Sequence, residues 1–390
     1  MTHVGALSGA ELALWRLVKH LDPKRYQPIV LTFADGPLVD RLQADGIPTV
    51  VVPLPQGVAS ARRGSLLRTA SLRGAGSAAS FIPRLTRSLR GLDIDVLHAH
   101  SLKADLISVA VSPLVRVPLV WHVHDRISAD YLPPRTARIV RTLAQRVPKH
   151  VVVNSQATLR TLMPLGQGWT VAYPGLDEVE FERGTRPSCE GGPIVGILGR
   201  IGPTKGQDVF LRAAAEVLVR HPTVQFRIIG SALFGEHGYE TELRRLSHEL
   251  GINGSVEFTG FVDDPASALR ALTVCVHASP VPEPFGQVIV EAMAAGVPTV
   301  VADAGGASEI VRDGEEVLAR LAEPGSVREL ADGIGWLLDH PDDALAMSDR
   351  AYWSVRRRFD IARTARAVMA AWDLVLGSAD RNLVSDDLAD

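Results

Sequence analysis

The chain has 390 residues, more than the roughly 250–300 at which a single hydrophobic core stops growing, so two domains are expected. Hydrophobic residues make up 46% and charged residues 22%, which is ordinary for a globular protein. The two cysteines, Cys189 and Cys275, belong to no CxxC motif or Cys/His cluster, which disfavours a disulfide framework or a zinc site and fits a reducing compartment. No apolar run reaches the ~18–20 residues that span a bilayer, and no signal-peptide pattern opens the chain, so a cytoplasmic location is expected.

The net charge of −3 is distributed unevenly along the chain. Residues 1–180 contain 21 Lys and Arg against 13 Asp and Glu, a balance of +8, whereas the remainder contains 20 against 31, a balance of −11. This asymmetry indicates either that the two halves meet different partners or that two solvated surfaces differ in charge.

Short β-branched runs alternate with helical patterns along the chain. Strands are predicted at 94–100, 118–124, 150–155, 193–199, 224–230, 256–260, 273–279 and 298–303. Several of these runs are apolar at consecutive positions, which is typical of parallel strands covered on both faces. The alternation predicts the α/β class, with βαβ units in two doubly wound, Rossmann-like sheets.

One segment near the start departs from this rhythm. Residues 56–91 contain no acidic residue and seven arginines: Arg62, Arg63, Arg68, Arg73, Arg84, Arg87 and Arg90. They could form a basic surface for an anionic membrane or acceptor, or a solvated loop and helix face.

The domain boundaries follow from composition. The stretch at 175–192 is rich in Gly, Glu and Pro and has no periodicity, which is typical of a linker. The predicted parts are a first domain at 1–175, a linker at 176–192, a second domain at 193–355, a helix at 356–376 with apolar residues at helical spacing, and a polar tail at 377–390.

A first candidate site lies at the start of the second domain. In "ILGRIGPTKGQDVF" (197–210), a predicted strand ends at Gly199, and a helix begins near Gln207. Ligands of open α/β sheets bind where strands end and helix N-termini supply unpaired N–H groups. Arg200 and Lys205 in this loop suit a diphosphate, although a solvated loop would carry the same residues.

A second candidate site is "EPFGQVIVEAMAAGVPTVVADAGG" (283–306). Glu283 precedes a short predicted helix and Glu291 lies within it, among apolar residues. A carboxylate in that setting needs a partner, and carboxylates can grip vicinal hydroxyls. Gly305 and Gly306 follow the next strand and could form an anion nest or a plain turn. Taken alone, this spacing also fits a helix-terminal glutamate and a surface glutamate.

Together, GR(x4)KG at 199–206, E(x7)E at 283–291 and GG(x2)E at 305–309 resemble the donor-binding half of family 4 retaining glycosyltransferases. The resemblance is clearest over 193–320. It implies a GT-B fold, in which two Rossmann-like domains face a cleft and a C-terminal helix, here 356–376, crosses back onto the first domain. It also implies a nucleotide diphosphate sugar as the substrate.

The resemblance implies a role for each matching residue of the donor half. Arg200 and Lys205 would neutralise the diphosphate, Glu291 would bind the ribose, and Glu283 would lie beside the transferred sugar. Backbone N–H groups of Phe285, Gly286 and Gln287 would touch the sugar hydroxyls. The nucleobase would rest near Gly230, Ser231, Phe261 and Val262.

In the first half, "SGAEL" (8–12) resembles the family's glycine-rich loop, with Gly9 near the donor phosphate and Ser8 in place of a glycine. Only seven residues precede it, so the usual first strand is expected to be short or missing, through a misassigned start codon or a trimmed domain edge. "WHVHD" (121–125) resembles the strand end whose histidine faces the sugar, which favours His124. His98, His100 and His122 are expected to be structural or acceptor-side.

The implied reaction transfers a hexose, with retention, to a hydroxyl of a glycan, lipid-linked or secondary-metabolite acceptor. A uridine donor is slightly favoured over GDP-mannose. Because Arg200 and Lys205 would neutralise the leaving group and no DxD pair ends a strand of the donor half, no metal or other cofactor is expected, and no nucleic-acid partner. A GT-B epimerase or phosphorylase and a non-catalytic nucleotide-sugar binding subunit are the alternatives.

Overall fold

The computed structural model describes residues 1–55, 72–183, 192–232 and 236–377. By its contacts the chain divides into two compact units. The first unit comprises Met1–Gly175 and Ile361–Asp390, and the second comprises Leu176–Asp360. The chain thus leaves the first unit once and returns to it with its last helix.

The second unit is built on a six-stranded, all-parallel sheet. Its strand order is β14-β11-β10-β7-β8-β9. The strands are β7 (Ile194–Leu198), β8 (Gln225–Ile229), β9 (Val256–Gly260), β10 (Val274–His277), β11 (Thr299–Ala302) and β14 (Arg320–Ala322). Since β8 and β9 extend the sheet from β7 on one side and β10, β11 and β14 on the other, the order reverses between β7 and β10. This is the doubly wound pattern predicted from the sequence.

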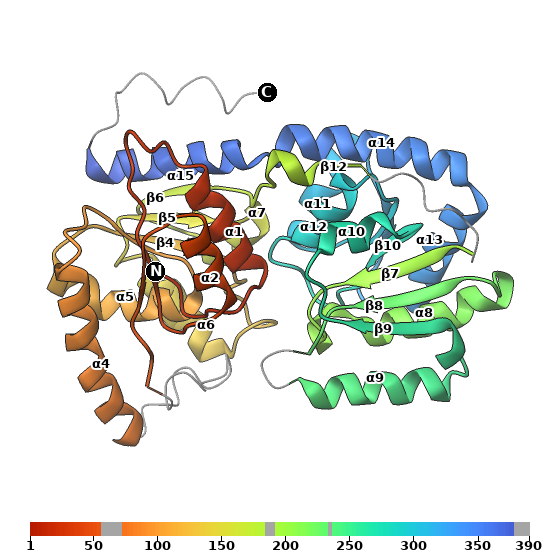
Figure 1. Ribbon diagram of the computed structural model, residues 1–390, viewed down its shortest axis with the longest axis horizontal. Coiled ribbons are helices and arrows are strands. Elements are labelled where there is room, and N and C mark those ends of the chain that lie inside the picture. Colours follow the sequence, from red (N-terminus) through yellow and green to blue (C-terminus); the bar gives the residue numbers. More distant parts are fainter. Residues whose placement is uncertain (56–71, 184–191, 233–235, 378–390) are drawn as a thin grey trace. The chain divides into compact units, whose positions relative to one another are not determined.

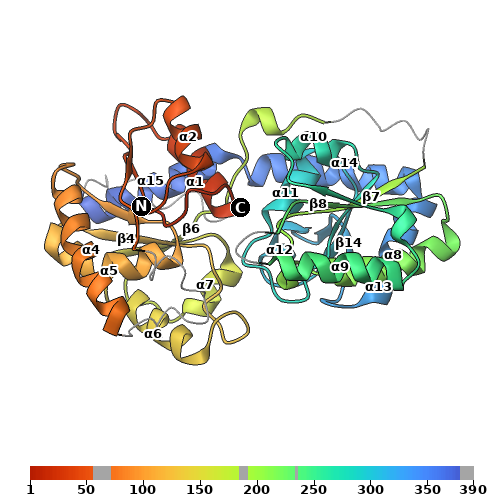
Figure 2. The ribbon, with the colours of Figure 1, turned by 60° about the horizontal axis from the view of Figure 1, so that its bottom comes forward.

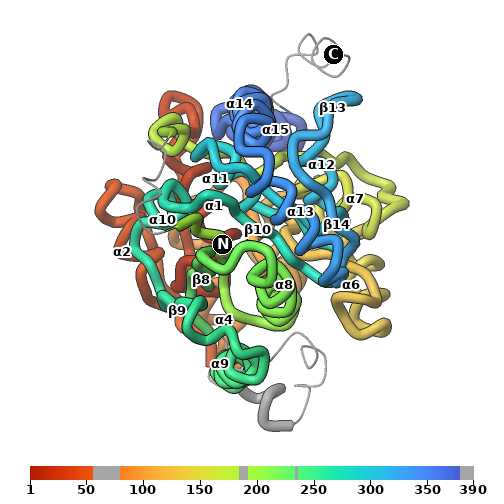
Figure 3. Tube along the Cα trace, turned by 90° about the vertical axis from the view of Figure 1, so that its right-hand side faces the viewer, coloured from red at the N-terminus to blue at the C-terminus, as the bar shows by residue number. Residues whose placement is uncertain are grey.

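Helices cover both faces of that sheet, as Figure 2 shows. They are α8 (Gln207–Arg220), α9 (His237–Glu249), α10 (Pro265–Arg270), α11 (Gln287–Ala294), α12 (Gly306–Ile310), α13 (Val327–Asp339) and α14 (Pro341–Arg358). Short elements complete the unit: η2 (Glu178–Glu180), η3 (Pro203–Lys205), η4 (Asn253–Ser255), β12 (Arg312–Asp313) and β13 (Glu316–Val317). Helices α8 and α13 lie side by side (Figure 3). In the core, the rings of Phe210 and Phe226 pack edge to face, with 5.7 Å between their centroids.

The first unit has a parallel sheet in two registered pieces. Its strands are β1 (Val30–Thr32), β2 (Thr49–Val51), β3 (Leu97–Ala99), β4 (Leu119–Val123), β5 (His150–Val153) and β6 (Gly168–Val171). β1 pairs with β2, and β3 to β6 pair in chain order. Met1 and Thr2 join the pieces, because Thr2 forms a parallel bridge with Thr32 while the N–H of His100 donates to the carbonyl of Met1 (2.9 Å). The first strand is therefore present in a very short form, as expected.

Seven described helices flank this sheet. They are α1 (Gly9–Lys19), α2 (Pro37–Ala44), α4 (Leu72–Arg90), α5 (Leu102–Val115), α6 (Pro134–Ala144), α7 (Gln156–Leu162) and α15 (Ile361–Leu376). Helix α15 runs along β5 and β6 and packs on α1 (Figure 1). Its buried residues Ala365, Val368, Ala371 and Trp372 recur every three to four positions, so one face of the helix is apolar.

All eight predicted strands are confirmed, with ends that differ by up to three residues. The short strands β1, β2, β6 and β14 were not predicted, because runs of three or four residues carry little periodicity. The stretch 356–376 is not one helix: α14 ends at Arg358 and α15 begins at Ile361. Part of the predicted linker (184–191) and nearly all of the tail (378–390) lie outside the described residues. No helix in the described ranges is long and apolar enough to cross a membrane.

Candidate functional site

The two candidate loops of the second unit follow neighbouring strands. Arg200 and Lys205 come after β7, Glu283 comes after β10, and β7 pairs with β10. The strand order of the sheet reverses between these two strands. Open α/β sheets bind ligands at such a reversal, because the loops there part and leave room. The fold therefore brings together residues 78 positions apart in the chain.

The loop after β7 is held in shape by a buried glutamine. The side chain of Gln207, at the start of α8, donates to the carbonyl of Arg200 (3.0 Å) and accepts from the N–H of Gly202 (3.4 Å). Lys205 ends the short helix η3. Arg200 and Lys205 remain half-buried, so both can reach solvent and a ligand.

The same loop is fastened to the end of β10. Gly206 has φ 73°, and a Cβ atom there would lie 1.9 Å from the carbonyl oxygen of Ala278. The Ser279 hydroxyl is 2.7 Å from the carbonyl oxygen of Thr204, to which it donates. Only glycine fits this close approach, which sets the position of Lys205 relative to the β10 loop.

Glu283 forms an ion pair with Lys205. Its Oε1 atom lies 2.6 Å from Lys205 Nζ, and its side chain is 12% exposed. Burial acts to raise the pKa of Glu283, but the Lys205 charge and the His277 ring outweigh it and hold that pKa well below its usual range. Glu283 is therefore a carboxylate, and Lys205 is both its partner and a cation available to a ligand.

His277 is a neighbour of Glu283 that the sequence analysis missed. It is the last residue of β10, it is buried, and its Nε2 atom lies 3.6 Å from Glu283 Oε2. Neither of its ring nitrogens has a hydrogen bond within the described part of the chain. Its place at a strand end next to the "EPFG" motif was the available signal.

Glu291 lies on α11, four residues after Gln287. Gln287 Nε2 donates to Glu291 Oε1 (2.9 Å), so the partner that this carboxylate needs comes from the same helix. Burial, followed by the charge of Glu291, raises the pKa of the Cys275 thiol to about 12. Glu291 and Gln287 thus form one polar group at the start of α11.

Phe285 and Gly286 prepare the N-terminus of α11. The Phe285 ring is buried against Phe359 (5.7 Å between ring centroids), which leaves only its backbone for a ligand. Gly286 caps the helix with φ 106°. Gly305 and Gly306 pack on this loop, and the N–H of Gly306 donates to the Glu283 carbonyl (2.8 Å). Of the two alternatives at 305–306, an anion nest or a plain turn, this hydrogen bond favours the plain turn, because the N–H of Gly306 is already used.

The loops after β8 and β9 continue the pairing beyond the sheet. Gly230 donates its N–H to the Gly260 carbonyl (2.9 Å), and the Ser231 carbonyl accepts from Ile201 (3.0 Å). A Cβ atom on Gly230 would lie 2.2 Å from the Gly199 carbonyl oxygen. Beyond β9, Phe261 is 63% exposed, whereas Val262 packs on a buried cluster. The exposed ring is free to stack on a planar group.

In the first unit, the "SGAEL" loop ends at α1, which begins at Gly9. Gly9 is exposed, and the close approach in this loop is made by Gly5, where a Cβ atom would lie 2.3 Å from the Asp35 carbonyl oxygen. Glu11 is buried and accepts from the hydroxyls of Ser8 and Thr2. Burial raises the pKa of Glu11 to about 6.

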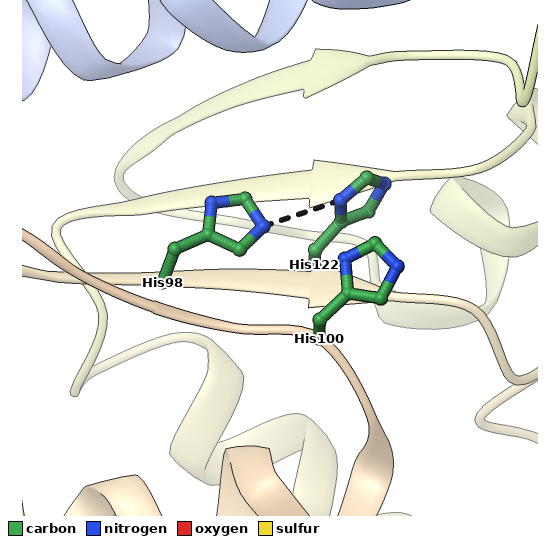
Figure 4. Close-up of side chains that lie close together, drawn as sticks. All are labelled: His98, His100 and His122. Carbon is green, nitrogen blue, oxygen red and sulfur yellow. Dashed lines mark hydrogen bonds between the residues drawn. The ribbon is translucent and has the colours of Figure 1, made fainter. Parts of the chain in front are cut away.

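His124 follows β4 and belongs to a cluster of four histidines. The centroid of its ring lies 4.2 Å from the ring centroids of His100 and His122. The His98 ring contacts the far members of the cluster, with its centroid 5.3 Å from that of His122. Figure 4 shows His98, His100 and His122, with the hydrogen bond between His98 Nε2 and His122 Nδ1 (3.2 Å). Burial lowers the pKa of His124 to about 4 and the pKa values of the other three well below their usual range. All four rings are therefore neutral at neutral pH.

Within the described residues, one group of three or more His, Cys, Asp and Glu side chains is close enough to hold a metal ion. It consists of His98, His100 and His122, each of which offers one ring nitrogen within 4.8 Å of the others. The donor-half residues Arg200, Lys205, Glu283 and Glu291 do not belong to it.

Part of the predicted basic segment can be located. Arg84 donates to the Pro53 carbonyl, which follows β2, and Arg90 donates to the Leu114 carbonyl in the last turn of α5 (2.7 Å), while Arg87 is exposed. Arg62, Arg63 and Arg68, and the side chain of Arg73, lie outside the described residues.

Comparison with known proteins matches both halves of the chain. Residues 178–353 match the family "Glycosyl transferases group 1", and residues 7–180 match "Glycosyltransferase Family 4". A phosphatidyl-myo-inositol mannosyltransferase of Mycobacterium tuberculosis is 30% identical over 298 residues, covering 73% of this chain and 75% of that protein. A D-inositol 3-phosphate glycosyltransferase of Nocardia farcinica is 30% identical over 306 residues, covering 72% and 67%.

Among solved structures, Anabaena Alr3699/HepE in complex with UDP-glucose superposes with a TM-score of 0.82. The two chains are 30% identical, and the match covers 97% of this chain and 99% of that one. The α/β class, the two Rossmann-like units and the motif order agree with these matches, so the chain has the GT-B fold and belongs to the family 4 glycosyltransferases.

Proposed function

We propose that this glycosyltransferase transfers a hexose, with retention, from a nucleotide diphosphate sugar to a hydroxyl acceptor. The observation that carries the proposal is the Lys205–Glu283 pair (2.6 Å) where the strand order of the second unit reverses. A cation beside a carboxylate at that edge suits a diphosphate joined to a sugar, because the two parts of the donor need opposite partners.

In this proposal, Arg200 and Lys205 stabilise the negative charge that grows on the leaving diphosphate. Arg200 is half-buried in a loop braced by Gln207, and Lys205 is held by the Gly206 contact, so both are oriented before a ligand arrives. Preorganised charges aimed at a developing charge are the largest single contribution in many enzymes. Because these two residues neutralise the leaving group, the proposed reaction needs no metal.

Glu283 would bind the transferred sugar rather than attack it. Its carboxylate is engaged by Lys205 at 2.6 Å, which favours accepting hydrogen bonds from the sugar hydroxyls over attack as a nucleophile. The acceptor hydroxyl would then approach the face from which the diphosphate leaves and pass its proton to the diphosphate. His124 of the first unit is proposed to face the sugar as a neutral ring. A neutral ring suits the cationic character of a glycosyl transition state.

Further residues are proposed to bind the donor. Glu291, oriented by Gln287, would accept hydrogen bonds from the ribose. The backbone of Phe285, Gly286 and Gln287 at the start of α11 would face the sugar hydroxyls. The loops at Gly230–Ser231 and Phe261–Val262 would take the base, with the exposed Phe261 ring beneath it. Gly9, at the start of α1, would approach the phosphate.

The donor base and the acceptor are proposed by analogy. A UDP-sugar is favoured over GDP-mannose because Anabaena Alr3699/HepE, matched over nearly its full length, was solved with UDP-glucose. The mannosyltransferase relative argues for a mannose donor. Both sequence relatives act on inositol-containing acceptors according to their names, which supports a polyol or lipid-linked acceptor. We place the reaction in the cytoplasm, with the basic segment touching an anionic membrane when the acceptor is a lipid.

Binding and turnover can be tested in sequence. Thermal-shift measurements with UDP, GDP, UDP-glucose and GDP-mannose should identify one base by a raised melting temperature. NMR of the product, formed with inositol phosphates and glycans as acceptors, should show a new glycosidic bond with the anomeric configuration of the donor. Inversion at the anomeric carbon would contradict retention. Turnover of donor without an acceptor would favour an epimerase, and binding without turnover would favour a non-catalytic subunit.

Two variants connect this test to the geometry. Arg200→Ala should abolish turnover while the circular dichroism spectrum stays unchanged. Arg227→Ala is a matched control, because Arg227 belongs to the same unit and pairs with Glu257 on its surface (2.8 Å). Full activity of the Arg200 variant would contradict the assigned diphosphate role.

A further inference from the structure

The four-histidine cluster of the first unit contains hydrogen bonds that a single sugar-facing histidine would not need. His98 and His100 lie two residues apart at β3, and His122 and His124 lie two residues apart at β4, so all four occupy one face of the sheet. That face is covered by α1 and α15, which supply Ala10 and Trp372 to the cluster. The action of these residues on His124 rests on the proposed function, in which His124 faces the transferred sugar.

The hydrogen bonds determine where each proton lies. The Trp372 indole can only donate, and its Nε1 lies 2.9 Å from His98 Nδ1, so that nitrogen carries no proton. His98 must then carry its proton on Nε2, which lies 3.2 Å from His122 Nδ1. His122 Nδ1 is in turn an acceptor, which leaves the proton of this ring on Nε2. A directed chain runs from Trp372 through His98 to His122 (Figure 4 shows its second bond).

His100 is determined independently. Its Nε2 atom lies 3.0 Å from the carbonyl oxygen of Ala10, which can only accept, so Nε2 is protonated and Nδ1 carries a lone pair. His100 Nδ1, His122 Nε2 and His124 Nε2 are buried and without a hydrogen-bond partner among the described residues. Of these three atoms, His100 Nδ1 is an acceptor and His122 Nε2 is a donor. The protonation of His124 Nε2 is not determined by its neighbours.

A metal ion is the competing explanation of this cluster. The separation of 3.2 Å between His98 Nε2 and His122 Nδ1 is close to the distance of about 3.3 Å between two nitrogens that share a tetrahedral zinc ion. A metal, however, requires a lone pair on His98 Nε2 and would move the proton to Nδ1. That proton would point at the N–H of the Trp372 indole, and two donors cannot form a hydrogen bond with each other. The position of Trp372 therefore excludes a metal at His98.

We propose that Trp372 and His98 are positioning residues. They fix the tautomer and ring orientation of His122 and thereby hold His124 in the orientation in which it is proposed to face the sugar. The His122 and His124 rings lie 4.2 Å apart at 31°, and the His100 ring lies 4.2 Å from His124 on another side. A rotation or tautomer change of His122 therefore disturbs the surface on which His124 rests. Trp372 lies 274 residues from His98 in sequence, so the C-terminal helix sets this chemistry.

The tautomers can be read directly in the unaltered protein. Long-range ¹H–¹⁵N NMR spectra of protein labelled at histidine should show His98, His100 and His122 protonated at Nε2. The indole proton of Trp372 should be shifted downfield and slow to exchange. Addition of one equivalent of Zn²⁺ should leave these signals unchanged. Protonation of His98 at Nδ1, or loss of the indole hydrogen bond on addition of zinc, would overturn the proposal.

The effect on the reaction needs a matched pair of variants. Trp372→Phe removes the indole N–H and keeps an aromatic ring against Tyr26 (5.2 Å). Trp121→Phe is the control: its indole donates to Ser108 (3.0 Å), it is fully buried in the same unit, and it points to the opposite face of β4. We expect Trp372→Phe to lower kcat about 2- to 10-fold with an unchanged donor KM, and Trp121→Phe to leave both unchanged.

Each outcome decides one question. Equal kcat values for the two variants would overturn the positioning role, even with the expected tautomers in the wild type. Expected tautomers in a protein that transfers no sugar would overturn the proposed function and leave the proton arrangement of the cluster standing. Mixed tautomers of His98 and His122 in Trp372→Phe, with reduced kcat, would support the proposal in full.

Discussion

Glu283 in the second unit and Glu11 on α1 of the first are carboxylates with little exposure, 12% for the Glu283 side chain and 2% for Glu11, and each lies near a proposed site. The pKa of Glu283 is held well below its usual range, whereas the pKa of Glu11 is raised to about 6. Burial acts to raise both. Glu283 differs because Lys205 lies 2.6 Å away, whereas the neutral hydroxyls of Thr2 and Ser8 donate to Glu11. Burial alone therefore does not decide the charge of a carboxylate; its partner does.

The same contrast extends to the neighbours of each residue. The second unit assembles charges, with Arg200, Lys205, Glu283 and Glu291 near one strand reversal. The first unit assembles neutral rings, since burial lowers the pKa values of His98, His100, His122 and His124. A diphosphate donor requires the first arrangement, and a cationic glycosyl centre is compatible with the second.

The largest expected effect comes from removing the charge pair. Lys205→Ala should lower kcat by about 10²–10³-fold, because the leaving diphosphate loses a preorganised cation. The variant should also raise the pKa of Glu283, whose main partner is gone. Steady-state kinetics at saturating donor measure the first effect. Arg227→Ala, in an exposed pair, should stay near wild type, and similar losses in both variants would show that any charge removal is harmful.

The next largest effect, on the free energy of unfolding, is expected at glycines where two backbone segments lie in close contact, one in each unit. Gly206→Ala should destabilise the protein by about 3 kcal/mol or more, because its Cβ would lie 1.9 Å from the Ala278 carbonyl oxygen at φ 73°. Gly5→Ala should do the same to the first unit. Gly254→Ala, with no heavy atom within 4 Å, should change the free energy of unfolding by less than about 0.5 kcal/mol. Urea unfolding measures all three, and a harmless Gly206 variant would remove the basis for the fixed Lys205 loop.

Glu291→Ala should weaken donor binding by about 10- to 100-fold, since a hydrogen bond to a charged group contributes about 1.5–3 kcal/mol. Calorimetry with the nucleoside diphosphate gives the dissociation constant. Glu257→Ala, which breaks the exposed pair with Arg227, serves as the control. Unchanged affinity in the Glu291 variant would mean that Gln287 holds this carboxylate for a structural reason only.

The two buried carboxylates should respond to pH with opposite signs. Glu11 binds its proton more tightly in the folded state, so the stability that it contributes is full below about pH 4.5 and is lost as the pH rises toward 6. Glu11→Gln should therefore become more stable than the wild type above pH 6, by about 2 kcal/mol. Glu283 shows the reverse, because its lowered pKa gives stability at neutral pH that is lost on acidification. Denaturation curves of Glu11→Gln from pH 4 to 8 and of Glu283→Gln from pH 3 to 8 measure both; equal signs would contradict the comparison.

The smallest effect is expected at the basic surface of the first unit. Arg87→Glu should weaken binding to vesicles that contain anionic phosphatidylserine about 5-fold or more, because each cation near such a surface contributes about 1 kcal/mol. Arg87 is preferred over Arg84 and Arg90, which donate to backbone carbonyls. Co-sedimentation with anionic and neutral vesicles provides the comparison. Equal binding to both kinds of vesicle would make this surface merely solvated.

Much of the second unit could be predicted from the chain. The strands from 193 to 303, the helix start at Gln207 and the end of α11 before Gly296 follow from periodicity and glycine positions. The order of three motifs was enough to indicate the family. His277 and Ser279 were missed, because neither belongs to a motif. Ser279 acquires its role from the Thr204 loop, more than 70 residues earlier, and His277 acquires its role from the Glu283 carboxylate beyond the strand.

The first unit was less predictable for a physical reason. Its strands β1 and β2 have three residues each, too few for a periodic pattern, and Met1 and Thr2 form only an isolated bridge to Thr32 and a hydrogen bond from His100. The strand-end histidine His124 was identified through its resemblance to the family. Its neighbours were assigned only a general structural or acceptor-side role.

By itself, the sequence determined the α/β class, the two-unit plan and the residue types of the donor site, because these depend on local periodicity and on motifs a few residues long. Only the tertiary structure decided which of these residues are paired, which way the protons of the histidine cluster point and that Trp372 directs them. Hydrogen bonds and ion pairs act over about 3 Å of space. The residues that make them here lie 78 positions apart at Lys205 and Glu283 and 274 apart at His98 and Trp372.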